Sequence, residues 1–257
     1  MLDQLYTSSL RMVWSQAPWD QVVCGFPVLQ ITSLEVLGPN AGEDMHIFVS
    51  ERDRLGVGLV SCRLSHERMV ESMLLEDQGF RFIEMVYAPE KELSPVCMNE
   101  KFAPLQVSLA REDDLPQLMD MARTSFHNER FKIDPRLNPN ISDQRYENWV
   151  ASSLHHPMQE LYVVCDASRR IAFFVTELLG DRTCYWHLNA VAPDAQGQGY
   201  GRRVWSAMMN QALEGGAQRV RTSIVARNHR VLNLYARLGF SFPPPSMTFH
   251  WVRPLTP

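Results

Sequence analysis

The stretch Gln196-Gly197-Gln198-Gly199-Tyr200-Gly201 decides the fold, because it joins an apolar strand to an amphipathic helix through three glycines. The apolar strand ends in Leu188–Ala192, and a helix is predicted over Tyr200–Glu214. Glycines let a backbone approach a phosphate without a Cβ clash, and the first turn of a helix presents N–H groups that lack an intrahelical partner. Arg202 and Arg203 add positive charge at the same end. The stretch therefore predicts a binding site for a pyrophosphate.

The spacing of the glycines excludes two other phosphate-binding loops. No Gly-Lys-Ser/Thr follows, as a Walker loop requires, and no Gly-x-Gly-x-x-Gly lies early in a βαβ unit, as a dinucleotide-binding fold requires. From Gln196 to Pro257 there are eight arginines and one acid, Glu214. The formal charge of this region is +7, which leaves −11 for the rest of a chain whose net charge is −4. Such a basic region forms either a solvated face or a site for a small polyanion.

Composition excludes several other classes of protein. A mildly acidic chain is not a general nucleic-acid-binding protein, and no uncharged apolar run approaches the ~20 residues of a membrane span. The first sixteen residues lack the basic and apolar segments of a secretory signal. The five cysteines are never spaced as Cys-x-x-Cys, and no His/Cys/Asp/Glu cluster has metal-ligand spacing. We therefore expect a cytoplasmic protein with reduced thiols, no metal, no nucleic-acid partner and no membrane insertion.

The chain is predicted to divide in two at the polar segment Asn99–Gln106, which Pro104 interrupts. We expect an N-terminal α/β lobe over residues 1–100 and a second domain over residues 105–257. The second domain alternates helical and strand-like runs, which indicates an α/β fold. The first lobe contains a similar pattern. In Gln78–Glu84 and in Leu238–Phe242, a predicted helix is followed by Gly-Phe and then by a strand-like run. This similarity is compatible with the first lobe being a degenerate copy of the second, although such junctions are common.

A second motif follows the glycine-rich loop. An apolar stripe at helical spacing runs from Val231 to Leu238, includes Tyr235 and ends at Gly239. Asn228 precedes Tyr235 by two helical turns, and Gly239-Phe240 follows. The order of the apolar strand, the Gln-x-x-Gly-x-Gly loop and this Asn–Tyr–Gly-Phe helix resembles the GCN5-related N-acetyltransferase (GNAT) superfamily. The resemblance covers residues 105–257. It implies a mixed, mostly antiparallel twisted sheet flanked by helices, and an acetyl-CoA-dependent N-acetyltransferase.

The resemblance also implies the site. A splayed strand pairs with the pantetheine arm, the loop holds the pyrophosphate, and a backbone N–H near Ala190 or Val191 polarises the thioester carbonyl. Tyr235 would be the general acid, since a phenol stays protonated at neutral pH and can donate to the departing thiolate. A core aromatic on the apolar stripe is the alternative for Tyr235. The implied CoA-binding residues are Leu188, Asn189, Ala190, Val191, Gln196, Gly197, Gln198, Gly199, Tyr200, Gly201, Arg202, Asn228 and Leu232.

A narrower resemblance concerns the acceptor. Phe126-x-x-x-Arg130-Phe131-x-x-Asp134 followed by Tyr146-x-x-Trp149 resembles the bacterial dTDP-fucosamine N-acetyltransferases, which acetylate the 4-amino group of a dTDP-linked sugar. Trp19–Phe26 matches their N-terminal lobe only in part, since Cys24 stands where Phe is usual. The resemblance implies a nucleotide-linked amino sugar as the acceptor. An arginine can fork onto a diphosphate and aromatic rings can stack on a base or sugar, with core packing as the alternative. The candidate acceptor residues are Arg130, Tyr146, Trp149 and Trp186.

Glu84 is the candidate general base. On an alternating strand it shares a face with Phe80, Phe82 and Val86, which would bury its carboxylate and raise its pKa. The alternatives are a carboxylate in solvent, a structural ion pair, and a water chain that takes the proton instead. His187 has no evident set of partners and is interpreted as a paired core histidine.

Three functions therefore remain open. The first is transfer of acetyl to a nucleotide-linked amino sugar by direct attack in a ternary complex. The second keeps the chemistry but takes an amino acid, a polyamine or a protein N-terminus as acceptor. The third is a catalytically silent CoA-binding module, against which the presence of both Asn228 and Tyr235 weighs. The resemblance is also compatible with a homodimer.

Overall fold

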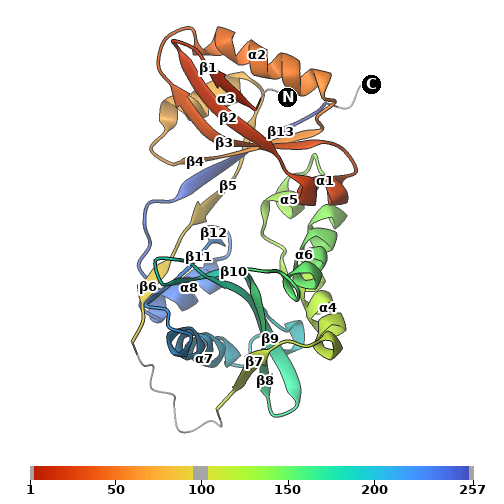
Figure 1. The fold of residues 1–257 in the computed structure, drawn as a ribbon, viewed down its shortest axis with the longest axis vertical. Coiled ribbons are helices and arrows are strands. Elements are labelled where there is room, and N and C mark those ends of the chain that lie inside the picture. The colour runs from red at the N-terminus through yellow and green to blue at the C-terminus, as the bar shows by residue number, and fades with distance from the viewer. Residues whose placement is uncertain (1–2, 95–103, 255–257) are drawn as a thin grey trace. The chain divides into compact units, whose positions relative to one another are not determined.

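The computed structural model describes residues 3–94 and 104–254, so most of the boundary segment Asn99–Gln106 lies outside the described residues, as does Cys97. The chain forms two compact units (Figure 1). Of the described residues, unit 1 holds those within Met1–Val86, Glu129–Ile141 and Pro244–Pro257, and unit 2 holds those within Tyr87–Asn128 and Ser142–Pro243. The units therefore differ from a simple division near residue 100. Two segments that the sequence assigns to the second domain, 129–141 and the C-terminal strand, belong to unit 1.

Unit 2 contains a mixed sheet in the order β6-β11-β10-β9-β8-β7. β10 and β11 are parallel, and the other neighbouring pairs are antiparallel. This confirms the predicted α/β fold with a mixed, mostly antiparallel sheet. The strands are β6 Glu90–Glu92, β7 Gln106–Leu109, β8 Glu160–Asp166, β9 Arg169–Leu178, β10 Thr183–Val191 and β11 Arg219–Thr222, and the two-residue β12 Ile224–Val225 follows.

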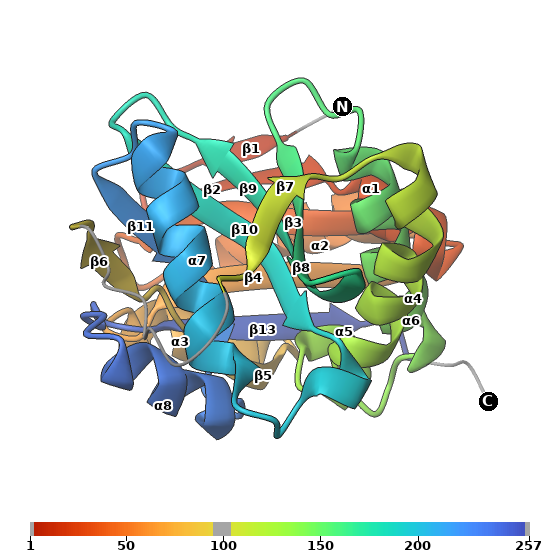
Figure 2. The same ribbon diagram turned by 90° about the horizontal axis from the view of Figure 1, so that it is seen from below.

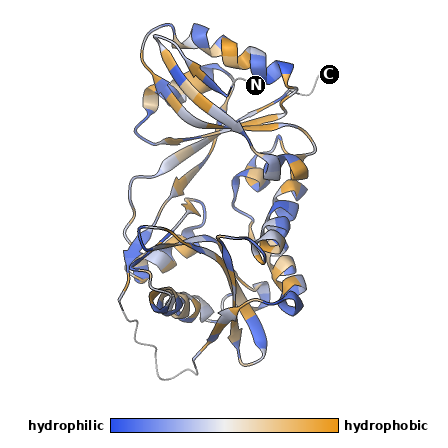
Figure 3. Cartoon of the chain, in the orientation of Figure 1, coloured by the Kyte–Doolittle hydropathy of each residue, from blue (hydrophilic) through white to orange (hydrophobic). Residues whose placement is uncertain are grey.

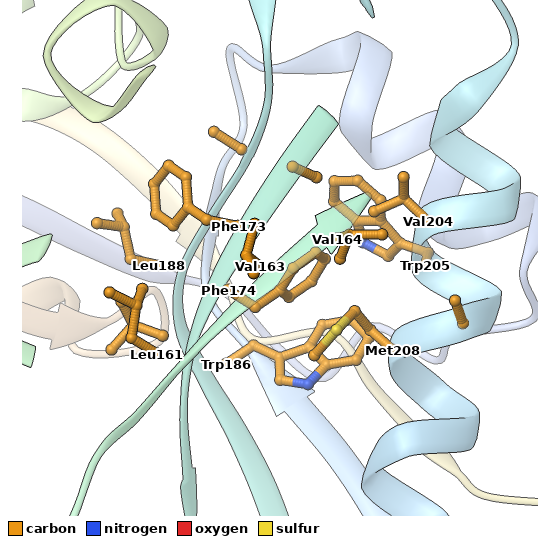
Figure 4. Packing of buried hydrophobic residues seen from close by; sticks show 14 of the residues in the cluster. Leu161, Val163, Val164, Phe173, Phe174, Trp186, Leu188, Val204, Trp205 and Met208 are labelled. Carbon is orange, nitrogen blue, oxygen red and sulfur yellow. The ribbon is translucent and has the colours of Figure 1, made fainter. Parts of the chain in front are cut away.

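Helices flank this sheet. α4 (Leu115–Ser125) packs on β10, and α7 (Tyr200–Glu214) packs on β7, β10 and β11, as Figure 2 shows for α7. α6 (Asn140–Ser153) and α8 (His229–Arg237) complete the set, with short 3-10 turns at Glu112–Asp114 and Pro193–Ala195. In Figure 4, Phe174 and Trp186 lie on the side of α7, whereas Phe173 and Leu188 lie on the other side of the strands. Both faces of the sheet are therefore buried.

α7 begins and ends where the sequence predicts. Its first residue follows the glycine-rich loop, and Gly216, with φ +89°, lies just after its end. Hydrophobic and hydrophilic residues occupy different sides of α7 (Figure 3), and Val204, Trp205 and Met208 enter the core. The periodicity that predicts this helix thus also fixes which side faces the sheet.

Unit 1 has its own sheet and core. Its strands lie in the order β1-β2-β3-β4-β13-β5, in which β3 and β4 are parallel and β13 is antiparallel to both neighbours. The core includes Trp14 and Phe48, whose rings meet edge to face with centroids 5.0 Å apart. The elements are β1 Gln4–Tyr6, β2 Leu10–Gln16, α1 Pro18–Cys24, β3 Val28–Val36, α2 Ala41–Arg54, β4 Leu59–Ser65, α3 Met69–Asp77, β5 Arg81–Tyr87, α5 Arg130–Ile133 and β13 Ser246–Val252.

The described residues contain no membrane-spanning helix, no metal-binding cluster and no disulfide. No helix there combines the length and the apolar character that crossing a membrane requires. No group of three or more His, Cys, Asp or Glu side chains is arranged there to hold a metal ion. Four cysteines in this part of the chain are free thiols: Cys24, Cys62, Cys165 and Cys184.

Candidate active site

The strand β10 of unit 2 separates from β11 halfway along its length. Its parallel register with β11 ends at the pair Trp186–Thr222, whereas its register with β9 continues to Val191. Thr222 Oγ1 donates to Trp186 O at 2.8 Å and closes the paired part. Beyond it, the segment Leu188–Val191 has no strand of the described residues on its β11 side. Apart from Val191 O, which accepts from Gln196 Nε2, backbone groups along this edge are therefore available to the amides of an extended ligand.

The glycine-rich loop continues from this edge into α7. Gly197 and Gly199 have φ values of +79° and +83°, which are accessible to glycine at no steric cost, and nothing lies within 4 Å of where a Cβ would stand. Gln196 Nε2 donates to Val191 O at 3.0 Å and Gln198 Nε2 donates to Asp194 O at 2.6 Å, which fixes the loop on the strand before it. No side chain caps the N-terminus of α7 in the described structure. Its first N–H groups are thus free to bind an anion.

Two of the three polar side chains in the first turn of α7 are already engaged. Tyr200 Oη donates to Asp166 Oδ2 at 2.7 Å, and Arg203 Nη1 lies 3.5 Å from the same oxygen. Arg202 is exposed and makes no ion pair with a described residue. Arg202 is therefore the arginine of this turn that can reach a phosphate without losing a partner.

α8 lies against the first turn of α7. A Cβ on Gly201 would stand 3.3 Å from Leu234 Cδ2, so the glycine permits this close approach. Asn228 begins α8 as its N-cap, and its side chain accepts from Val231 N at 3.3 Å. Leu232 is partly buried against the core. Asn228 thus has a structural reason to be present, which weakens its weight against a silent CoA-binding module.

Tyr235 on α8 is buried, with 1% of its surface exposed. Burial raises the pKa of its phenol to about 12, and hydrogen bonding with Trp205, Thr222 and Asn189 opposes that increase. The tyrosine therefore stays protonated at neutral pH, as a general acid must. Because Asn189 belongs to the free edge of β10, the structure brings together the candidate general acid and a candidate CoA-binding residue.

The candidate acceptor residues of unit 2 separate into core and partly exposed side chains. Trp186 is fully buried between Phe174 and Phe240, with ring centroids 5.1 Å and 6.3 Å away, so the structure places it in the core. Tyr146 is 9% exposed and stacks on Phe126 at 4.2 Å. The Trp149 ring is only partly buried, and its Nε1 donates to Gln159 Oε1 at 3.3 Å.

A β-bulge on β10 connects the aromatic residues to a histidine. The register with β9 shifts between Trp186 and Leu188, so His187 is the extra residue. His187 Nε2 lies 2.8 Å from Glu177 Oε2, and its ring lies 6.1 Å from that of Trp149. His187 is thus paired, as the sequence predicts, but it lies at the bulge beside the free edge, and about a fifth of its side chain is exposed.

Glu84 lies in unit 1, on β5, opposite Thr248 of β13. The pairing of these strands shifts so that Phe82 meets Phe249, which makes Ile83 the bulged residue. Phe82 therefore packs edge to face with Phe249 at 6.0 Å, on the face away from Glu84. The prediction that Glu84 and Phe82 share a face is wrong, because one extra residue reverses the alternation.

The environment of Glu84 is buried but polar. The residue is 4% exposed, its Oε1 lies 3.6 Å from Arg63 Nη2, and its Oε2 has no hydrogen-bond partner among the described residues. Burial raises the pKa of Glu84 to about 7, although the positive charges of Arg63 and Arg130 oppose the shift. Arg130 itself donates to the buried Asp20 Oδ2 at 3.2 Å. The structure thus brings Glu84 and Arg130, predicted separately, into one cluster.

Sequence reasoning missed a further part of this cluster. Asp134 is fully buried and accepts from Arg136 Nε at 2.9 Å, Arg136 Nη2 at 2.8 Å and the backbone N of Arg136 at 3.1 Å. His250 Nδ1, on β13, lies 3.0 Å from Asp134 Oδ2. Asp134 stands in the motif that resembles the sugar acetyltransferases, which was the available signal. His250 carried no signal, because it is separated from Asp134 by 116 residues.

Unit 2 combines a mixed sheet, a strand that separates from its neighbour, and a helix without a side-chain cap that follows a glycine-rich loop. Residues 115–240 match the family described as the Acetyltransferase (GNAT) family. Residues 115–240 therefore form a domain of the GNAT family, and this family uses acetyl-CoA.

Individual relatives are distant. Over 128 residues the chain is 23% identical to the spore coat polysaccharide biosynthesis protein SpsD of Bacillus subtilis (strain 168), a match that covers 50% of this chain and 44% of that protein. A GCN5-related N-acetyltransferase from Sphaerobacter thermophilus aligns with a TM-score of 0.64 and 13% identity, over 96% of this chain and 78% of that chain. A functionally unknown conserved protein from Staphylococcus epidermidis ATCC 12228 aligns with a TM-score of 0.67 and 12% identity, over 97% and 93% of the two chains. At these identities the two solved structures show the fold alone.

Proposed function

We propose that this protein is an acetyltransferase. It transfers the acetyl group of acetyl-CoA to a primary amine of a nucleotide-linked, dTDP-type amino sugar, by direct attack in a ternary complex in the cytoplasm. The observation that carries the acetyl-CoA half is the free edge of Leu188–Val191, which leads into a loop with two open glycines and an uncapped helix. A pantetheine arm has two amides to pair with such an edge, and a pyrophosphate suits the helix N-terminus.

Bond making and breaking in this proposal involve few protein groups. The neutral amine attacks the thioester carbonyl carbon, a C–N bond forms, and the C–S bond breaks. A backbone N–H near Ala190 or Val191 polarises the carbonyl oxygen. Tyr235 gives its proton to the departing thiolate. Its pKa of about 12 keeps the phenol protonated until negative charge develops on the sulfur. Glu84 takes the proton that the amine nitrogen loses as the C–N bond forms, directly or through water.

The acceptor half depends on different observations. Arg130 and Glu84 lie in one buried polar cluster, and the charge of Arg130 acts on the carboxylate of Glu84. A cluster of this composition suits a charged, polar ligand. SpsD, which the chain resembles over half its length, is named for the biosynthesis of a spore coat polysaccharide. The match of residues 126–149 to dTDP-fucosamine N-acetyltransferases points the same way. Acetylation of a nucleotide-activated amino sugar is consistent with all three.

The decisive experiment is an acceptor screen. The protein is incubated with acetyl-CoA and a panel of dTDP- and UDP-linked amino sugars, amino acids, polyamines and peptides, while free CoA thiol is followed. We expect thiol release with amino sugars in preference to the other amines. Release with peptides alone, or no release with any amine despite tight CoA binding, would contradict the proposal in favour of a protein acetyltransferase or a silent CoA-binding module.

The pH profile tests the base. A base acts when deprotonated, so a carboxyl whose pKa is raised to about 7 predicts that kcat/KM rises with pH up to about 7 and then levels. Glu84→Gln should lower kcat/KM by about 10²-fold, within the usual range for general-base catalysis, and flatten this limb. The matched control is Glu76→Gln, an exposed glutamate of the same unit. An unchanged limb in Glu84→Gln would assign the proton to a water chain.

A further inference from the structure

His250 in unit 1 is a buried histidine whose outer nitrogen has no partner. It lies on β13, between β4 and β5, and none of its surface is exposed. Its Nδ1 contacts Asp134, which Arg136 holds through two guanidinium bonds. Its Nε2 is buried and has no hydrogen-bond partner among the described residues. A buried polar atom left in this state is costly, which makes its natural partner worth identifying.

The protonation of this pair follows from its surroundings. Burial opposes ionisation of Asp134, but the hydrogen bonds from His250 and Arg136 outweigh it and lower the pKa of the aspartate well below its ordinary value. Burial lowers the pKa of His250 to about 4, and the charges of Arg130 and Arg136 act in the same direction. A neutral imidazole beside a carboxylate carries its proton on the nitrogen that faces the carboxylate. Nε2 is therefore a hydrogen-bond acceptor.

A second buried acceptor lies on the same face of the sheet. Glu84 pairs across the strands with Thr248, and His250 follows Thr248 by two residues on a strand whose register with β4 is unbroken. Diagonal neighbours of this kind in antiparallel strands lie roughly 7–8 Å apart. Glu84 Oε2 is, like His250 Nε2, buried without a hydrogen-bond partner among the described residues. The charge of Arg130 acts on both groups.

We infer that His250 Nε2 and Glu84 Oε2 together bind an acceptor that carries a hydroxyl group next to its amine: the hydroxyl donates to His250 and the amine donates to Glu84. This inference rests on the proposed function and narrows its substrate class, because an amine on a plain alkyl chain would leave His250 Nε2 unpaired. Asp134 is a positioning residue, which keeps Nε2 free of its proton. An internal water molecule between the two atoms is the competing occupant.

A substrate pair separates the two occupants. The acceptor is a dTDP-linked 4-amino-4,6-dideoxyhexose with its 3-hydroxyl, and the comparison is its 3-deoxy counterpart. In the wild-type enzyme we expect kcat/KM to favour the hydroxyl-bearing sugar by about tenfold or more, the usual effect of leaving a buried polar group unpaired. In His250→Phe the preference should fall to about threefold or less. The control is His46→Phe, an exposed histidine on α2, which should keep the preference.

Each outcome has a distinct meaning. An equal loss of kcat/KM for both sugars in His250→Phe would overturn the inference and assign a water molecule or a structural role to Nε2. His250→Gln, whose amide oxygen can still accept, should keep part of the preference, and it serves if the phenylalanine variant does not fold. Nitrogen-15 NMR of the wild-type imidazole adds a readout without turnover, since protonation at Nε2 would also overturn the inference. Absence of turnover with every amine would instead contradict the proposed function, and the NMR result would still stand.

Discussion

The two units contain the same succession of strands and helices, but they differ in how the edge of the first strand in that succession is occupied. In unit 1 the run is β3, α2, β4 and α3, and in unit 2 it is β10, α7, β11 and α8. In each, the first strand is parallel to the third element over four residue pairs, which end at Ile31–Cys62 and at Trp186–Thr222. In each, a bulge follows at once, at Thr32 and at His187. The strands therefore separate at the same place in both units.

The second helices correspond as closely. α3 and α8 are nine residues long, and each is followed after one residue by a glycine with positive φ, +82° at Gly79 and +78° at Gly239. A buried phenylalanine comes next in both. Counting back from the glycines places Leu75 where unit 2 has Tyr235. The similarity between the two sequence segments thus extends to backbone geometry, which supports the prediction that the N-terminal lobe is a degenerate copy of the second domain.

In unit 1, side chains of the same unit form hydrogen bonds with the edge of β3 beyond its separation from β4. From α3 and its N-cap, Arg68 Nη2 donates to Leu34 O at 2.9 Å, and Glu71 Oε1 accepts from Val36 N at 3.2 Å. In unit 2 the corresponding positions hold Asn228, which caps its own helix, and Val231, which has no polar side chain. Side chains of unit 1 therefore bind the backbone groups of its own edge, whereas we propose that the corresponding edge of unit 2 binds acetyl-CoA.

The loops before the first helices differ in shape and in charge. Gly38 in unit 1 lies against Ser9, because a Cβ there would stand 2.8 Å from Ser9 Oγ, whereas Gly197 and Gly199 have open space. The first turn of α2 carries Glu43 and Asp44. Carboxylates repel a phosphate at the position where α7 carries arginines. We therefore expect a CoA site only in unit 2, where the loop, the edge and the charge all favour it.

The largest expected effect tests the hydroxyl of Tyr235 on α8, since α3 has Leu75 at the corresponding position. Tyr235→Phe should lower kcat by about 10²-fold or more, because the thiolate then leaves without its acid, while acetyl-CoA affinity changes little. Steady-state kinetics and calorimetric titration measure the two quantities. The control is Tyr162→Phe in the same unit, since Tyr162 has a similarly raised pKa of about 12 but bonds to Glu160. Unchanged kcat in Tyr235→Phe would make Tyr235 a core aromatic.

An intermediate effect concerns the glycine loop. We expect one acetyl-CoA to bind per chain by calorimetric titration, in unit 2, despite the shared topology. Gly199→Ala should weaken this binding by about tenfold, since an L-residue at φ +83° costs about 1–2 kcal/mol and its Cβ stands where the phosphate approaches. The control Gly42→Ala, in the first turn of α2, has equally open space and a φ outside the left-handed region. A stoichiometry of two would show that unit 1 retains a site.

Whether the sequence predicts a feature of the two units depends on how far apart along the chain the contacting residues lie. Local patterns predict the bounds of α7, the apolar stripe that carries Tyr235 and the pyrophosphate loop. The structure agrees with the predicted helix and stripe, and it gives the loop a geometry that suits a pyrophosphate. The bulge at Ile83 adds one residue, which no alternation of apolar and polar residues reveals. Trp186 could be read as a ligand-stacking ring because burial between Phe174 and Phe240 depends on packing from three elements.

The sequence predicts the cluster of Glu84, Arg130, Asp134 and His250 only in part. Glu84 and Arg130 are predicted for separate reasons, and their proximity depends on the return of residues 129–141 to unit 1. His250 enters because the C-terminal strand inserts between β4 and β5, which the chain order does not indicate. Non-local strand pairing of this kind leaves no periodic trace in a single sequence.

The smallest expected effects come from the two N-terminal turns of α3 and α8, and they separate stability from binding. Glu71→Ala should lower the free energy of unfolding by about 1–3 kcal/mol in urea, because Val36 N loses its acceptor, with no change in acetyl-CoA affinity. Asn228→Ala should lower it by about 1 kcal/mol through loss of the helix cap, and should also raise the KM for acetyl-CoA. If KM is unchanged, Asn228 is a cap and nothing more. If Glu71→Ala creates a second acetyl-CoA site, an open edge suffices, and the glycines and arginines of α7 are not what distinguishes the two units.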